Sequence, residues 1–201
     1  MDLCTYHSHC NFCDGKAPAE DFVRAAIEAG FHSYGISSHS PLPFETRWSL
    51  SKGNVEAYLM ELKRLQEKYA GQIELYVGME IDYLNDDWGP AVEYFQRMPL
   101  DYRIGSVHLV TEEQTGEIMD MDGKFEDFRE NLRMVFRDDL KYLVEAYFKA
   151  SSRMVELGGF DFVAHLDKIS MNGSLMDSTL TEQEWYNRCL LYTSPSPRDV
   201  E

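Results

Sequence analysis

The chain has 201 residues, of which 44% are hydrophobic and 13% aromatic, a composition typical of a folded globular protein. Its 35 acidic and 19 basic residues give a formal net charge of -16, the reverse of the balance expected for a nucleic-acid-binding protein. No apolar run approaches the roughly 20 residues of a membrane-spanning helix, and the first residues lack the pattern of a secretory signal. We therefore expect a cytoplasmic protein that binds neither nucleic acid nor membrane, and the sequence indicates no oligomeric state.

Short apolar runs alternate with segments whose apolar residues recur at helical spacing. In chain order this pattern predicts a strand at 3–7, a helix at 18–29, a strand at 32–37, a helix at 54–69, a strand at 73–81, a helix at 92–98, a strand at 102–107, one or two helices over 125–157 and a strand at 160–164. The alternation favours an α/β fold with a mainly parallel sheet, either a barrel or an open sheet. A barrel is favoured because no Gly-rich dinucleotide motif follows the first strand, and because chemically active residues follow five different strands.

Five of the six histidines fall at or just after the end of a predicted strand; they are His7, His9, His39, His108 and His165. Side chains two apart on a strand point the same way, so two of these imidazoles can reach one ion. Asp14 follows in a turn, and Glu80 ends an otherwise apolar strand, where an unpaired buried carboxylate would be costly. The pattern predicts a cluster that holds zinc, manganese or iron, while His32, which begins its strand, is expected to be structural.

The four cysteines do not form a structural zinc motif, because Cys10 and Cys13 make a single C-x-x-C without a second pair. We expect a reduced protein in which these two residues are small buried side chains rather than metal ligands, although both lie close to His9.

Several motifs together resemble those of the polymerase-and-histidinol-phosphatase (PHP) superfamily. They are HSH followed by Asp14-Gly15, SSHSP, GMEIDYL, DYRIGSVH and FDFVAHLDK, and they cover residues 3 to about 170. SHSPLPF, Trp48, GMEIDYL and GSVH resemble in particular the histidinol-phosphatases of histidine biosynthesis. The resemblance implies a distorted (β/α)7 barrel of the PHP type, two or three divalent metal ions, and a small phosphate monoester as substrate.

The resemblance also implies roles for individual residues. The implied metal ligands are His7, His9 and Glu80 for a first ion, Asp14 and His39 for a second, and Glu80, His108 and His165 for a third, with Glu80 bridging two ions. Glu80, His39 and Asp14 would then be the catalytic residues, and metal-activated hydroxide would attack the phosphorus of L-histidinol phosphate without a phospho-enzyme. Arg47, Arg103 and Lys168 flank the motifs and could bind the phosphate, although a solvated charge is the alternative for each.

From Cys189 the sequence reads CLLYTSPSPRD, which resembles a translated adapter used in preparing sequencing libraries; a genuine Ser/Pro-rich tail is the alternative. We therefore expect a PHP phosphoesterase domain over residues 3–188, without the last strands and helices of the barrel, and an artefactual segment over 189–201. The family's final Asp-x-His ligand pair has no match, so the third metal site is expected to be complete and the other two to lack a ligand each.

Two other functions fit the same residues. The chain could be another PHP-type phosphoesterase, such as a phosphodiesterase, an exonuclease-like domain or a protein-tyrosine phosphatase, because metal chemistry alone does not select the leaving group. It could also be a non-catalytic metal-binding module.

Overall fold

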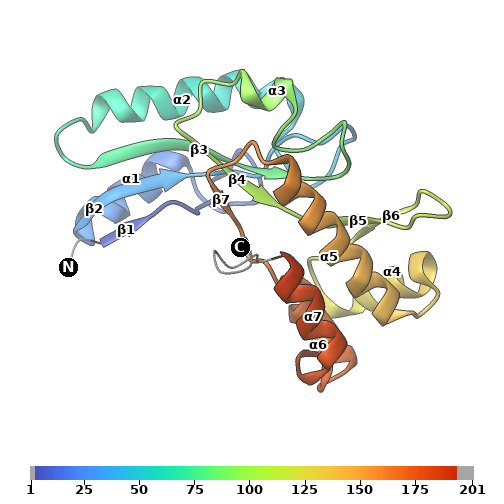
Figure 1. Ribbon diagram of the computed structural model, residues 1–201. Helices are drawn as coiled ribbons and strands as arrows, with labels where there is room; N and C mark the ends of the chain where they lie inside the picture. The colour runs from blue at the N-terminus through green and yellow to red at the C-terminus, as the bar shows by residue number, and fades with distance from the viewer. Residues whose placement is uncertain (1–2, 194–201) are drawn as a thin grey trace, which may run out of the picture. The chain divides into compact units, whose positions relative to one another are not determined.

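The computed structural model describes residues 3–193, which form two compact units (Figure 1). The first unit contains residues 3–82, 90–105 and 159–162, and the second contains residues 83–89, 106–158 and 163–193. Each unit therefore combines segments that are far apart in the chain.

A five-stranded sheet forms the centre of the first unit, with its strands in the order β1-β2-β3-β4-β7. The strands are β1 (Leu3–Thr5), β2 (Phe31–Ile36), β3 (Glu74–Asp82), β4 (Tyr102–Ser106) and β7 (Phe162–Val163). β1 pairs with β2 and β2 with β3 in parallel, so that Ser33 lies opposite both Cys4 and Glu74. The order of the strands follows the chain, as successive β/α units of a barrel-type fold require. The predicted α/β fold and its five strands are confirmed.

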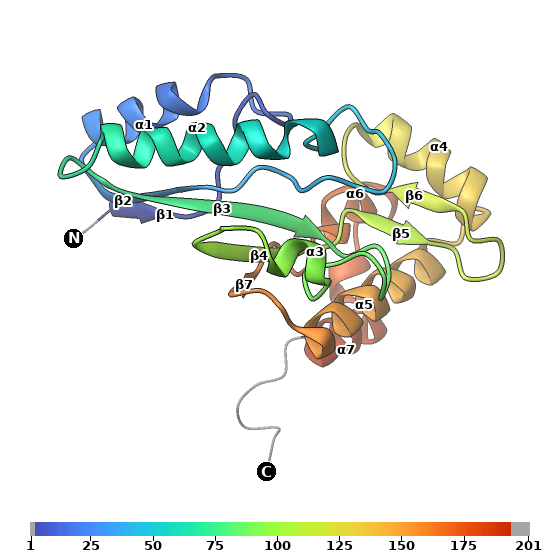
Figure 2. The ribbon, with the colours of Figure 1, turned by 90° about the horizontal axis from the view of Figure 1, so that it is seen from above.

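Helices α1 (Ala19–Glu28) and α2 (Val55–Lys68) pack side by side on one face of this sheet (Figure 2). α2 buries Val55, Tyr58, Leu62 and Leu65, which recur every three or four residues along one face of the helix. Each such side chain contributes about 1.5–3 kcal/mol when it is fully buried. A short 3-10 turn (Lys52–Asn54) precedes α2, and α3 (Glu93–Gln96) is a single turn.

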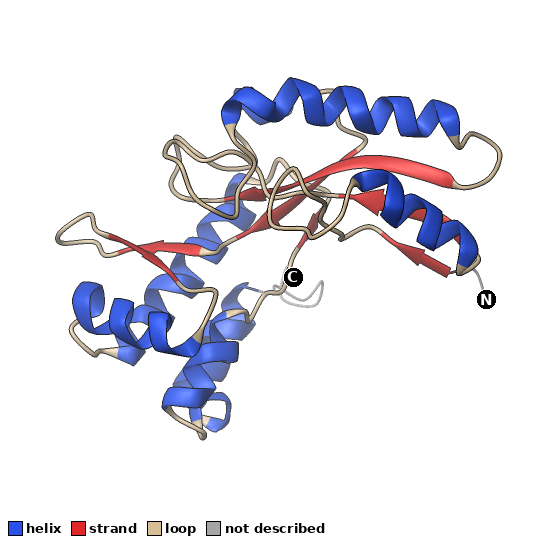
Figure 3. Cartoon of the chain, turned by 180° about the vertical axis from the view of Figure 1, so that it is seen from behind, coloured by secondary structure: helices blue, strands red, loops and turns tan. Residues whose placement is uncertain are grey.

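The second unit is mainly helical (Figure 3). α5 (Leu140–Leu157) packs against α4 (Phe125–Phe136), α6 (Ile169–Met176) and α7 (Glu184–Thr193), and also contacts a hairpin of β5 (Leu109–Thr111) and β6 (Ile118–Asp120). The segment predicted as one or two helices is two. Arg137 and Asp138 separate them with left-handed φ angles of 54° and 62°, and Asp139 then caps α5 by accepting a hydrogen bond from Tyr142 N at 2.9 Å.

The hairpin, α6 and α7 were not predicted from the sequence. α7 contains Cys189–Thr193, the first residues of the segment expected to be artefactual; the remainder of that segment, 194–201, lies outside the described residues. Among the described residues, no helix combines the length and the apolar character needed to cross a membrane.

Candidate metal centre

Glu80 is the focal point of the candidate site in the first unit. Glu80 is fully buried near the end of β3, and its backbone pairs with His39 in the segment that follows β2. Glu80 N donates to Ser38 O at 3.1 Å, and Ser40 N donates to Glu80 O at 2.7 Å, which places His39 beside Glu80. The parallel sheet thus fixes a carboxylate and an imidazole at the carboxyl ends of neighbouring strands.

Three imidazole nitrogens converge on one carboxylate oxygen of Glu80. Glu80 Oε2 lies 3.1 Å from His7 Nε2, 3.1 Å from His9 Nε2 and 3.2 Å from His39 Nδ1. Two ligand atoms that share a tetrahedral zinc ion, at bond lengths of about 2.0–2.1 Å, are about 3.3 Å apart. The spacing of these nitrogen and oxygen donors therefore fits ligands of a divalent cation.

Asp14 extends the cluster toward solvent. Its Oδ1 lies 3.1 Å from His9 Nδ1, its Oδ2 lies 3.9 Å from His39 Nε2, and its side chain is 49% exposed. The turn that carries Asp14 is closed by hydrogen bonds from the amides of Cys13 and Gly15 to Cys10 O. A Cβ atom on residue 15 would meet the Cys10 backbone at 2.5 Å, so this turn requires glycine.

His7, His9, Asp14, His39 and Glu80 form two overlapping groups of potential ligands, and the ligand atoms within each group lie within 4.8 Å of one another. One group contains His7, His9 and Glu80, and the other contains His9, Asp14 and His39. The structure thus brings together the five first-unit residues predicted from the sequence, and their donor set suits divalent metal binding.

The electrostatics of the cluster favour positive charge. Burial lowers the pKa of His9, but hydrogen bonds to Cys13 and Glu80 and the charge of Glu80 raise it to about 10. Burial raises the pKa of Asp14, but the charges of His39 and His9 outweigh burial and lower it. A proton on His9 meets this demand, and a divalent cation would displace that proton on binding.

Tyr58 and Trp48 support the cluster, although the sequence did not identify either as a site residue. The Tyr58 hydroxyl accepts a hydrogen bond from Ser38 N at 3.2 Å and donates to Gly78 O at 2.7 Å, which ties the ends of β2 and β3 together. The Trp48 ring lies edge-on to His39, with 4.9 Å between the ring centres. Trp48 was noted only as part of a motif, and Tyr58 only as part of an apolar helix face.

The second unit contains two of the predicted histidines, His108 and His165. His108 Nε2 and His165 Nε2 are 3.2 Å apart, and His108 is buried. The backbone around them is held by Met121 N, which donates to His108 O at 3.0 Å, and by the Tyr147 hydroxyl, which donates to His165 O at 3.2 Å. Two ring nitrogens at this distance can share a proton or approach one cation.

The second unit also contains an ion pair that the sequence did not predict. Lys168 Nζ lies 2.9 Å from Asp122 Oδ2. Burial raises the pKa of Asp122, but Lys168, the Gly123 amide and His108 together lower it by more, so the net shift is downward. Asp122 lies in the loop after β6. It belongs to no motif and no periodic pattern, so in the sequence it looks like any solvent-exposed acidic residue.

The remaining predicted residues occupy different environments. Arg47 is exposed in the loop after His39. Arg103 donates through its guanidinium to the carbonyls of Phe95, Gln96 and Met98 at 2.9–3.2 Å, and so fixes the turn that follows α3. Lys168 forms the ion pair just described.

Three further residues noted in the sequence differ in their distance from the cluster. His32 and Cys10 have contacts that fit structural roles, whereas Cys13 is half-buried beside His9. His32, at the start of β2, lies 3.6 Å from Glu74. Cys10 is fully buried with its Sγ 3.4 Å from Ser38 Oγ, whereas Cys13 Sγ lies 3.6 Å from His9 Nδ1.

Comparison with known proteins finds a matching family, similar sequences and similar folds. The family model described as the PHP domain matches residues 5–192. A protein named "Probable histidinol-phosphatase" from Deinococcus radiodurans is 26% identical over 174 residues, which cover 82% of this chain and 60% of that protein. The chain spans about half the length of the curated relatives it matches.

Two solved structures have a similar fold. A candidate histidinol phosphatase from Listeria monocytogenes superposes with a TM-score of 0.76 at 23% identity, covering 95% of this chain and 78% of that one. A histidinol phosphate phosphatase from Lactococcus lactis, in complex with zinc, L-histidinol and phosphate, superposes with a TM-score of 0.62 at 19% identity, covering 94% of this chain and 66% of that one.

Proposed function

We propose that this chain, which belongs to the PHP domain family, is a metal-dependent phosphatase that hydrolyses L-histidinol phosphate to L-histidinol and phosphate. The observation that carries the proposal is the convergence of three imidazole nitrogens on one oxygen of the buried Glu80. Support for the substrate comes from the relatives named as histidinol-phosphatases and from the Lactococcus lactis protein bound to L-histidinol and phosphate.

The proposed metal ligands in the first unit are His7, His9 and Glu80 for one ion and Asp14 and His39 for another. In the second unit, His108 and His165 would contribute imidazole ligands. Divalent ions, when bound, activate water and stabilise negative charge on the phosphate oxygens. Zinc, manganese and iron all suit imidazole and carboxylate donors.

The chain's own residues orient these ligands. Asp14 Oδ1 accepts a hydrogen bond from His9 Nδ1, which directs His9 Nε2 toward Glu80 Oε2. A carboxylate behind a ligating histidine fixes the tautomer and the direction of the ring. Tyr58 and the backbone pairing of His39 with Glu80 hold the ends of two strands in register, so the ligand positions are set before any cation binds.

Substrate contacts are proposed for exposed or charged residues near these motifs. We assign Arg47 to the phosphate, because this residue is exposed in the loop after His39 and a guanidinium can bind phosphate oxygens. Arg103 and Lys168 stay predictions; the contacts of Arg103 with the turn after α3 and of Lys168 with Asp122 give both a structural role as well.

The test is phosphate release by the purified 201-residue chain, freed of metal and then supplied with manganese or zinc. We expect L-histidinol phosphate to be hydrolysed faster than phosphotyrosine or a phosphodiester, and Glu80→Gln to abolish the reaction. Preference for a diester or for phosphotyrosine would favour another phosphoesterase of the family. Metal binding without hydrolysis of any of these esters would favour a non-catalytic metal-binding module and would refute the proposal.

A further inference from the structure

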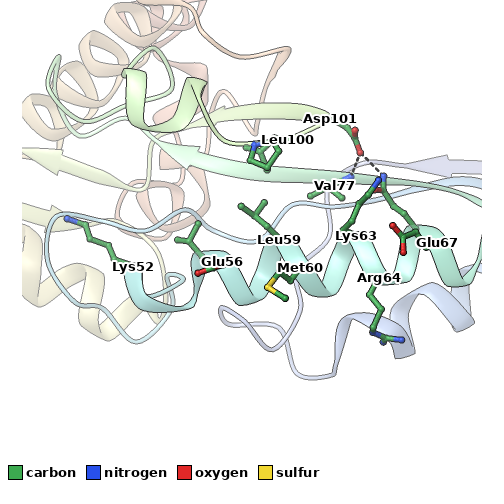
Figure 4. Close-up of a pocket in the computed structure, with 13 residues that line it drawn as sticks. Lys52, Glu56, Leu59, Met60, Lys63, Arg64, Glu67, Val77, Leu100 and Asp101 are labelled. Atoms are coloured by element: carbon green, nitrogen blue, oxygen red, sulfur yellow. Dashed lines mark hydrogen bonds between the residues drawn. The ribbon is translucent and has the colours of Figure 1, made fainter.

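The outer side of α2 carries a groove that the proposed reaction does not use. It has a volume of about 1080 Å³ and lies between α2 and residues 99–101, with Val77 of β3 also lining it (Figure 4). Asp101 holds the far wall in place, because its Oδ2 accepts hydrogen bonds from Val77 N and Gln66 Nε2, both at 2.8 Å. The groove is therefore a built feature of the first unit.

The middle of the groove is apolar and open. Met60 is 66% exposed, Leu59 is half-buried, and Leu100 lies across from Leu59 (Figure 4). Exposed apolar side chains that line a groove commonly mark a surface that another molecule covers.

Charged residues on the two sides of α2 differ in their pairing. On the side that faces α1, Arg64 and Lys68 both form ion pairs with Glu20. On the groove side, Glu56, Lys63 and Glu67 are exposed, and within residues 3–193 none of these three forms an ion pair. Charges on the groove side are therefore available to a partner.

The order of these groove-side residues is self-complementary. Counted outward from the midpoint between Leu59 and Met60, Glu56 on one side corresponds to Lys63 on the other. These four positions recur at helical spacing, so they lie on one face of α2. Two such helices packed antiparallel would place each Glu56 opposite a Lys63, whereas parallel packing would oppose like charges.

We propose that the groove side of α2 is the interface of a twofold-symmetric dimer formed with a second copy of this chain. In this dimer Glu56 of each copy pairs with Lys63 of the other copy, so the contact occurs twice. Met60 of each copy enters the groove of the other beside Leu59. The second copy is the occupant because the charge order matches its own reverse.

Charge exchange tests the interface directly, by sedimentation velocity of the 201-residue chain over a series of concentrations. We expect the wild type to dimerise, and Lys63→Glu or Glu56→Lys to raise the dimer dissociation constant about 30-fold, because each change turns two attractive pairs into two repulsive ones. The double variant E56K/K63E exchanges the two charges and should restore dimerisation. Arg129→Glu, at an exposed position of α4, makes the same change in charge as Lys63→Glu; it is the control and should leave the dimer unchanged.

Circular dichroism establishes that each variant is folded. Because the double variant carries both substitutions, its restored association would show that neither substitution weakens the dimer by disrupting the fold. A wild type that stays monomeric at every concentration would overturn the proposal and leave the groove to a different partner. A dimer that neither single substitution weakens would overturn it as well, because it would form through another surface.

Discussion

Replacing Tyr58 with phenylalanine removes one buried oxygen and leaves the aromatic ring in place. The lost hydroxyl accepts a hydrogen bond from Ser38 N at 3.2 Å, donates to Gly78 O at 2.7 Å and lies 3.1 Å from Ile36 O. Tyr58 is fully buried, so water cannot replace these contacts. Leaving a buried donor or acceptor unsatisfied costs about 1–3 kcal/mol per group.

Two such groups, Ser38 N–H and Gly78 C=O, give an expected loss of about 2–6 kcal/mol in the free energy of unfolding. For a chain of this size, each kcal/mol lowers the melting temperature by about 2–4 °C, so Tyr58→Phe should melt about 4–24 °C lower than the wild type. Burial raises the pKa of Tyr58 well above its usual value, so the hydroxyl stays protonated and the loss should be the same at pH 6 and pH 8.

The assay is thermal unfolding followed by circular dichroism, with Tyr76→Phe as the matched control. The Tyr76 hydroxyl donates to Glu74 at 3.2 Å in an exposed position, and its removal should change stability by less than about 0.5 kcal/mol. Equal melting temperatures for Tyr58→Phe and Tyr76→Phe would refute the role of Tyr58 in joining the ends of β2 and β3.

Two further predictions concern the substrate and the response to acid. Arg47→Ala should raise KM for L-histidinol phosphate with little change in kcat, and unaltered steady-state kinetics would remove Arg47 from the proposed site. Hydrogen bonds from Lys68, Arg64 and Tyr69 lower the pKa of Glu20 from 4.5 to about 2. The stability that Glu20 adds is therefore complete above pH 4.5 and is lost as the pH falls toward 2, so urea midpoints of wild type and Glu20→Gln should differ at pH 7 and converge at pH 2.

The strands and the larger helices were predictable because their sequence periodicity agrees with their burial. The hairpin was not, because its two three-residue strands are too short for alternation to be visible. α6 was not predicted because its sequence, ISMNGSLM, favours a turn. Packing against other segments stabilises the helix. Asn172 donates to Met121 O at 3.2 Å, and Gly173 packs so closely against Leu180 that a Cβ on residue 173 would meet the Leu180 side chain at 2.7 Å.

The candidate site was predictable to the extent that its members mark the ends of strands. Glu80 stood out as a carboxylate ending an apolar run, and the parallel sheet then places His39 beside it. Tyr58 and Asp122 were not identified, because their contacts with Ser38 and Lys168 depend on chain segments that only folding brings together. The roles of the individual metal and substrate residues stay predictions.

Divalent-metal affinity, measured by competition with a chromogenic chelator, tests whether the cluster around Glu80 is a metal centre. We expect the metal-free wild type to bind zinc and Glu80→Gln to weaken binding by about 100-fold or more, because the loss of even a residue that only supports ligands costs about 10–100-fold. Glu74→Gln, on the same strand but exposed, should bind as the wild type does. Equal zinc affinity in the wild type and Glu80→Gln would contradict the assignment of this cluster as a metal centre.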